Sequence, residues 1–184
     1  MKSYFGNDDD PSLRILNAAK KFGFTDVIRV TSDDPFRCIE SMDKLCEEHI
    51  KYGFNASKTI NLPYGTHTEI INTNFLKNLL KRIKNIHHRE YLEEYLMFPN
   101  TIVNQMRVNN GINFDQKYRL TIDYKEDYKF INKLLEKNIK FDSKIKKIVN
   151  EINKSNSLKS MTKKLQKISK GHFERRKNIN TLIL

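Results

Sequence analysis

Long apolar runs and cysteine are scarce in this sequence of 184 residues, and each shortage excludes a class of protein. No apolar run approaches the roughly 18–20 residues that a membrane-spanning helix needs, and the opening MKSYFGNDDD lacks the apolar stretch of a signal peptide. The only cysteines, Cys38 and Cys46, are too few for a disulfide framework and wrongly spaced for a zinc knuckle. We therefore expect a cytoplasmic protein with free thiols.

Apolar residues are nevertheless sufficient for a folded core. Hydrophobic residues make up 38% of the chain and aromatic residues 10%, with charged residues at 30%. Aromatic side chains occur along most of the chain, which argues against wholesale disorder. A chain of this length is typical of one main domain.

The net charge of +12 is concentrated at one end of the chain. Residues 138–184 hold 13 of the 34 Lys and Arg residues and 3 of the 22 Asp and Glu residues, so this segment carries +10 and residues 1–137 carry +2. We predict a folded domain over 1–137 and a basic helical tail over 138–184. Such a tail can bind nucleic acid or an anionic membrane surface, and it can equally be a solvated, lysine-rich helical surface.

The hydrophobic pattern predicts helices and strands that alternate along the chain. Helices are expected over 11–22, over 36–52, after a cap at Thr73 or Asn74, over 89–98, over 126–137 and twice in the tail. Strands are expected over 26–32, 55–61, 66–71, 101–108 and 118–123. This alternation predicts an α/β fold, in which ligands usually bind beyond the carboxyl ends of the strands.

Carboxylates lie at the ends of two predicted strands that are far apart in the sequence. Asp33 and Asp34 follow the first strand, and Asp123 ends the strand YRLTID. Mg²⁺ takes oxygen ligands from one or two carboxylates and leaves other positions to substrate phosphates. Asp33 and Asp123 are therefore candidate metal ligands, although an Asp at a strand end also serves as a turn or helix cap. Asp127 fits better as an acid in the first turn of a helix.

Short motifs along residues 5–153 resemble, in the same order, those of the cytidylyltransferase family that activates acylneuraminate, KDO and related sugars, spore-coat-polysaccharide-type members included. These motifs are Phe5–Asp10 with Leu13 and Arg14, Ala18–Lys20, Arg29–Phe36, Pro63–Gly65 with Glu69, Arg89 and Glu90 with Tyr95, Arg119–Asp123 with Glu126 and Asp127, and Asn150–Asn153. No single motif is decisive, but their shared order is hard to obtain by chance.

The resemblance implies a three-layer α/β/α nucleotide-diphospho-sugar transferase fold, similar to a Rossmann fold and usually homodimeric, over residues 1–137. It implies that CTP and a sugar acid give a CMP-sugar and pyrophosphate, in surface-polysaccharide or glycan biosynthesis. Asp33 and Asp123 match the two metal-binding aspartates of the family, so Mg²⁺ is the expected cofactor. The positions that fall where the family lines its sugar pocket are Gly65, Glu69, Arg89 and Glu90.

One departure from the family concerns the nucleotide. The family begins with a strand and a phosphate-gripping loop, Ala-Arg-x-x-Ser-x-Arg-x-Pro-x-Lys, and no segment of this sequence matches it. We therefore expect an N-terminally truncated fold that needs a separate chain with this loop for activity. Two alternatives stay open: a non-catalytic module for sugar binding or dimerisation, and a nucleic-acid binder that uses the basic tail.

Overall fold

The computed structural model describes residues 3–83, 86, 89, 92, 103–107 and 118–180. These residues form two compact units, each assembled from separate stretches of the chain. The first unit comprises Met1–Arg29, Leu45–Lys58 and Glu69–Gln105, and the second comprises Val30–Lys44, Thr59–Thr68 and Met106–Leu184. The predicted division of the chain at residue 137 stays a prediction.

Helix α1 (Pro11–Phe22) has the bounds that the sequence predicts. The side chain of Asp10 caps the helix by accepting a hydrogen bond of 2.9 Å from the backbone N–H of Leu13. Pro11 occupies the first turn, where its missing N–H costs nothing. Gly23 ends the helix with a φ of 72°, a left-handed conformation that favours glycine.

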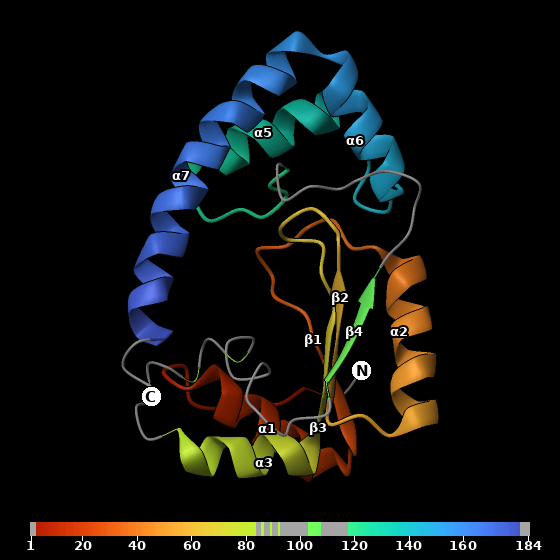
Figure 1. The fold of residues 1–184 in the computed structure, drawn as a ribbon, viewed down its shortest axis with the longest axis vertical. Coiled ribbons are helices and arrows are strands. Elements are labelled where there is room, and N and C mark those ends of the chain that lie inside the picture. Colours follow the sequence, from red (N-terminus) through yellow and green to blue (C-terminus); the bar gives the residue numbers. More distant parts are fainter. Residues whose placement is uncertain are drawn as a thin grey trace. The chain divides into compact units, whose positions relative to one another are not determined.

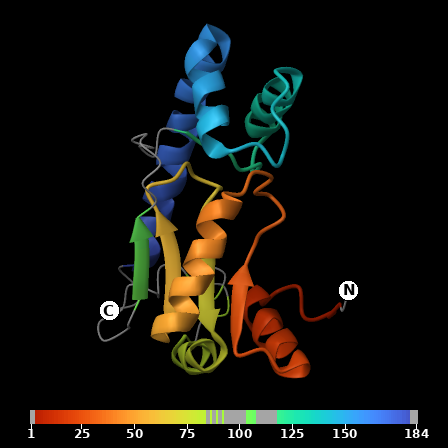
Figure 2. The same ribbon diagram turned by 90° about the vertical axis from the view of Figure 1, so that its right-hand side faces the viewer.

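A four-stranded sheet has the order β1-β3-β2-β4. Its strands are β1 (Asp26–Arg29), β2 (Ala56–Ile60), β3 (Glu69–Asn72) and β4 (Val103–Arg107). Strand β3 is antiparallel to both β1 and β2, whereas β4 points in the same direction as its neighbour β2 (Figure 2). The α/β class is confirmed, and the sheet is mixed rather than parallel throughout. The predicted strand over 118–123 is reduced to a single bridge between Tyr64 and Arg119.

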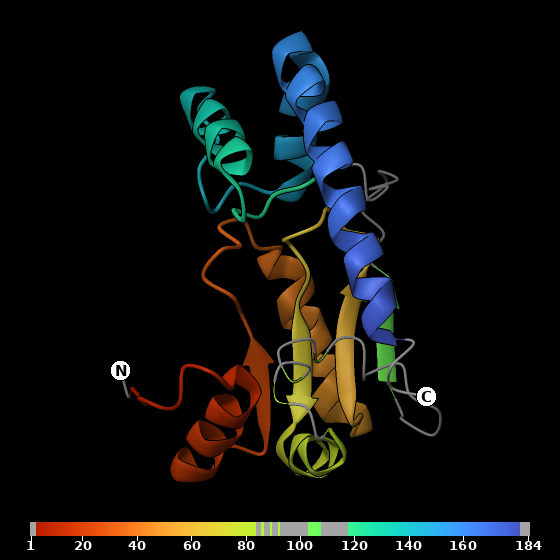
Figure 3. The same ribbon diagram turned by 90° about the vertical axis from the view of Figure 1, so that its left-hand side faces the viewer.

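Helix α3 (Thr73–Arg82) packs against α1 and β3 in the first unit (Figure 3). The predicted cap at Thr73 or Asn74 is wrong, because the side-chain oxygen of Asn72 accepts from the N–H groups of Asn74 (3.0 Å) and Phe75 (3.2 Å). Asn72 is also the last residue of β3, so strand and helix follow each other without a loop. Its extended backbone suits both roles.

Helix α2 (Ile39–Tyr52) begins at Ile39 rather than at Phe36, and Gly53 follows it with a φ of 63°. The first residues of the predicted helix instead belong to the loop after β1, where Phe36 is fully buried. Most of the predicted helix over 89–98 lies outside the described residues.

Three helices of the second unit, α5 (Lys125–Glu136), α6 (Ile145–Lys154) and α7 (Asn156–Asn180), pack against one another (Figure 1). Their buried apolar residues are Phe130, Ile131, Leu134, Ile145, Ile148, Val149, Ile152, Leu158 and Leu165. The apolar stripes that predicted two tail helices are therefore buried against each other and against α5. None of the helices in the described part of the chain is both long and apolar enough to span a bilayer.

Candidate functional site

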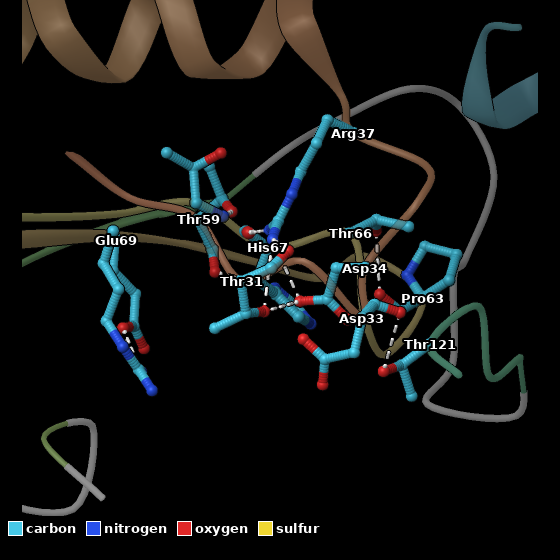
Figure 4. Close-up of polar contacts among 12 residues, drawn as sticks. Thr31, Asp33, Asp34, Arg37, Thr59, Pro63, Thr66, His67, Glu69 and Thr121 are labelled. Atoms are coloured by element: carbon cyan, nitrogen blue, oxygen red, sulfur yellow. Dashed lines mark hydrogen bonds and ion pairs between the residues drawn. The ribbon is translucent and has the colours of Figure 1, made fainter. Parts of the chain in front are cut away.

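The loop after β1 folds around Asp34. The hydroxyl of Thr31 donates to the Asp34 carboxylate (2.8 Å), and the guanidinium of Arg37 pairs with the same oxygen (3.0 Å). The other arm of that guanidinium donates to the backbone oxygen of His67 (Figure 4). Burial raises the pKa of Asp34 although Thr31 and Arg37 act to lower it. The carboxylate of Asp34 is therefore engaged in holding the loop together.

Asp33 is held through its backbone. Its carbonyl oxygen accepts hydrogen bonds from the N–H of Ile122 (2.8 Å) and from the hydroxyl of Thr121 (3.4 Å). Its side chain is half-buried, and among the residues that the structure describes none bonds to its carboxylate. Asp33 thus has a fixed backbone and a carboxylate that no described residue engages.

Gly65 lets three segments of the second unit meet. The backbone of Tyr64, the residue before it, pairs with the segment 118–120: its N–H bonds to Tyr118 O (2.9 Å) and its oxygen accepts from Leu120 N–H (2.8 Å). Gly65 has a φ of +88°, and a Cβ there would lie 2.7 Å from the backbone nitrogen of Thr121 and 2.9 Å from a carboxylate oxygen of Asp34. Any larger residue would push these segments apart.

Arg119 organises the segment that contains Asp123. It is buried, and its guanidinium donates to both oxygens of Asp127 (2.8 and 3.0 Å) and to the carboxylate of Asp123. The rings of Tyr64 and Tyr124 lie 5.1 and 5.4 Å from the guanidinium carbon. Burial alone would lower the pKa of Arg119, but the two carboxylates outweigh it and raise the pKa. Arg119 is therefore a permanent cation beside Asp123.

Asp127 combines this ion pair with the cap of α5. Its carboxylate accepts hydrogen bonds of 3.0 Å from the backbone N–H groups of Asp123 and Tyr124, and its side chain is 1% exposed. The interpretation of Asp127 as a first-turn acid is confirmed in position, but the pattern gave no indication of its buried pair with Arg119. The first turn of α5 is thereby fixed to the residue that holds Asp123.

Asp33 and Asp123 are 90 positions apart in the numbering, and the structure connects their neighbourhoods. Asp33 bonds through its carbonyl to Ile122, the residue before Asp123. The Asp123 side chain is 31% exposed, and only one of its oxygens pairs with Arg119. Within the described ranges no group of three or more His, Cys, Asp or Glu residues is arranged to hold a metal ion. A magnesium site here would take two carboxylates from the chain and the remaining oxygens from water or phosphate.

The residues predicted to line a sugar pocket are only partly described. Gly65 lies in the second unit, between the segments of Asp34 and Thr121. Glu69 lies in the first unit, where its carboxylate pairs with Arg29 (3.0 Å) and its side chain is 12% exposed. Glu90 lies outside the described residues. A sugar-binding role for these residues stays a prediction.

Arg89 is fully engaged within the first unit. Its guanidinium pairs with the buried carboxylate of Asp10 (2.8 Å) and donates to the backbone oxygens of Leu80 (3.0 Å) and Ile83 (3.1 Å). It therefore joins the start of α1 to the end of α3. A contact with sugar, which the resemblance implies, would come in addition to this structural role.

The sequence patterns did not point to two residues that organise the candidate site, Arg119 and Arg37. Arg119 belongs to one of the motifs that resemble the family. Its buried ion pairs could have been suspected from Asp123 and Asp127, which follow it by four and eight residues. The contact of Arg37 with the turn 62–68 gave no signal, because its acceptor there is a backbone oxygen that any residue at position 67 would provide.

Residues 7–148 match the family described as cytidylyltransferase. The chain is 24% identical over 170 residues to protein MJ1063 of Methanocaldococcus jannaschii, covering 92% of this chain and 70% of that protein. It is 29% identical over 131 residues to the spore coat polysaccharide biosynthesis protein SpsF of Bacillus subtilis, covering 70% of this chain and 53% of SpsF. A solved cytidylyltransferase structure from Leptospira borgpetersenii has a TM-score of 0.74 at 22% identity, covering 84% of this chain and 67% of that one.

Proposed function

Because this chain belongs to the cytidylyltransferase family, we propose that it takes part in the transfer of the CMP group of CTP to a sugar acid, which releases pyrophosphate and gives a CMP-sugar. The product would serve surface-polysaccharide or glycan biosynthesis, as the name of the relative SpsF suggests. The observation that carries the proposal is the bond from Ile122 to Asp33, because it joins the two motifs that hold the family's aspartates.

We propose that Asp33 and Asp123 hold a Mg²⁺ ion. Their carboxylates are the oxygen donors that this cation prefers, and within the described part of the chain neither is fully enclosed by protein groups. When bound, Mg²⁺ would neutralise charge that develops on the departing pyrophosphate. Arg119 holds Asp123 in place and balances part of its negative charge.

For the sugar acid, the proposal carries over the family's sugar-binding role to Gly65, Glu69, Arg89 and Glu90, each by its place in a motif. The support for these four residues is their match to the family motifs. We also propose the three-layer α/β/α arrangement and the homodimer that the family resemblance implies. The phosphate-gripping loop of the family would have to come from a segment outside this sequence.

The proposal is tested by following CMP-sugar and pyrophosphate formation from CTP, Mg²⁺ and either acylneuraminate or KDO. The chain is assayed alone and with an added segment that carries the phosphate-gripping loop. Asp33→Asn and Asp123→Asn should each lower the rate by a factor on the order of 100, since each removes a charge that acts in the transition state. The exposed Asp142→Asn is the control with the same chemical change.

Two outcomes would contradict the proposal. Folded mixtures that form no CMP-sugar in any arm would exclude CMP transfer to these two sugar acids, and binding of the sugar acid without CTP would then favour a non-catalytic sugar-binding module. Equal activity in Asp33→Asn, Asp123→Asn and the control would remove these aspartates from the site.

A further inference from the structure

We propose that Arg37 is a positioning residue, which clamps the loop 30–37 to the turn 62–68 and thereby sets the direction of the Asp33 carboxylate. This inference rests on the proposed function, in which Asp33 is a metal ligand. Nothing in the sequence motifs assigns a role to Arg37, which follows the motif Arg29–Phe36.

The guanidinium of Arg37 contacts three places at once. One arm donates to the backbone oxygen of His67, and the other reaches the Asp34 carboxylate (3.0 Å) and the backbone oxygen of Thr31 (3.4 Å). The side chain is 12% exposed, so these bonds are largely shielded from water. The two terminal nitrogens of a planar guanidinium can donate to His67 and Asp34 at the same time, whereas the single ammonium group of lysine cannot.

Asp33 lies between two anchors. On one side, its carbonyl bonds to Ile122. On the other, the next residue, Asp34, is held by Arg37 and Thr31. Since no described residue bonds to the Asp33 carboxylate itself, the backbone between these anchors sets the direction of the Cα–Cβ bond from which this carboxylate projects. Release of the Arg37 anchor would let this stretch of backbone move and displace the carboxylate, and loss of a supporting contact around a metal ligand typically lowers metal affinity about 10–100-fold.

The ion pair between Arg37 and Asp34 allows the effect of Arg37 on fold stability to be separated from its effect on the position of Asp33. Asp34 is mostly buried, so Arg37→Met alone would leave an uncompensated charge in the interior and destabilise the fold. Removing both partners in Arg37→Met with Asp34→Asn avoids that charge, and paired removal is often nearly neutral. The double variant should therefore fold. It still lacks the hydrogen bond from residue 37 to the backbone oxygen of His67, so the loop 30–37 is no longer held to the turn 62–68.

The experiment measures Mn²⁺ affinity of the full chain by the loss of the free-ion electron paramagnetic resonance signal. It compares the wild type with Asp33→Asn, Arg37→Lys and the double variant, each checked for a wild-type urea midpoint. The exposed pair Lys144–Glu40 of the same unit, changed to Met and Gln, is the matched control. We expect about tenfold or greater weakening in both Arg37 variants, no binding in Asp33→Asn, and no change in the control.

A second readout is independent of metal. The amide of Ile122, which donates to the Asp33 carbonyl, should exchange its hydrogen faster in the Arg37 variants than in the wild type and the control. Wild-type Mn²⁺ affinity and unchanged Ile122 exchange in the Arg37 variants would overturn the inference. A wild type that binds no Mn²⁺ would instead contradict the proposed metal site, and exchange at Ile122 would still decide whether Arg37 clamps the loop.

Discussion

His49 shows how a single buried polar residue connects elements of the first unit. Its Nδ1 lies 2.7 Å from the hydroxyl of Ser57 on β2, and its Nε2 lies 3.1 Å from the carboxylate of Asp26 on β1. Asn72, the cap of α3, donates to the same Asp26 oxygen (3.1 Å). Ser57 and His49 are almost fully buried, so a substrate could not reach this serine, and the arrangement is structural.

Asp26 makes this network sensitive to pH. Burial alone would raise its pKa, but hydrogen bonds from Thr25, His49 and Asn72 outweigh it and lower the pKa below the ordinary value of 3.8. A carboxyl with a lowered pKa in the folded state contributes stability above its unfolded pKa, and this contribution is lost as the pH falls through the folded value. The network should therefore be intact at neutral pH and weaken below about pH 4.

Asp26→Asn should lower the free energy of unfolding at pH 7 by about 1–2 kcal/mol, because bonds to a charged acceptor are replaced by weaker ones. The difference from the wild type should shrink as the pH is lowered from 4 towards 2. Urea unfolding at several pH values measures both, with the exposed Glu47→Gln as control. A difference that persists at the lowest pH would show that the charge of Asp26 is not what stabilises the fold.

Local sequence patterns predicted most helices and strands well, but they did not predict which distant segments contact one another. Asp10, Pro11 and Gly23 mark the ends of α1, and each acts through its own backbone geometry. The contact of three segments at Gly65 depends on its close approach to Thr121, 56 positions further along the chain, and no local sequence pattern indicates this contact. The same holds for the antiparallel place of β3 between β1 and β2.

The tail helices illustrate what periodicity can decide. Ile145, Ile148 and Ile152 predicted an amphipathic helix, and all three are buried in α6. Periodicity cannot tell which surface covers such a stripe, and here the bundle with α5 and α7 covers it. Helices α6 and α7 thus pack against each other and against α5.

Ile148→Ala tests this packing. Ile148 is fully buried, so removing its side chain beyond Cβ should lower the free energy of unfolding by about 2–5 kcal/mol. The neighbouring Lys147→Ala changes an exposed position of the same helix and should have an effect within about 0.5 kcal/mol. Thermal or urea unfolding gives both values, and equal small effects would mean that α6 contributes little to the stability of its unit.

Charge is distributed unevenly over the whole molecule, since residues 138–184 carry +10 of the net +12. On α7, Lys159, Lys163 and Lys167 are exposed and spaced four residues apart, so they share one face of the helix. No acidic residue occurs between Glu151 and Glu174 to compensate them. Like charges at this spacing repel one another, and a polyanion would relieve the repulsion.

We expect the chain to bind double-stranded DNA weakly, without sequence preference, and with an affinity that falls steeply with salt. Changing Lys159, Lys163 and Lys167 to Gln should reduce the slope of log affinity against log salt by about 2–3, since each phosphate contact contributes about 0.9. The control changes Lys21, Lys77 and Lys81 to Gln, which removes the same charge from exposed positions of the first unit. Fluorescence anisotropy between about 50 and 200 mM salt, the range in which such contacts respond, measures both slopes.

If the two triple variants lower the slope equally, net charge alone governs the binding and α7 is a solvated surface. If only the α7 variant lowers it, the basic tail is a polyanion-binding face.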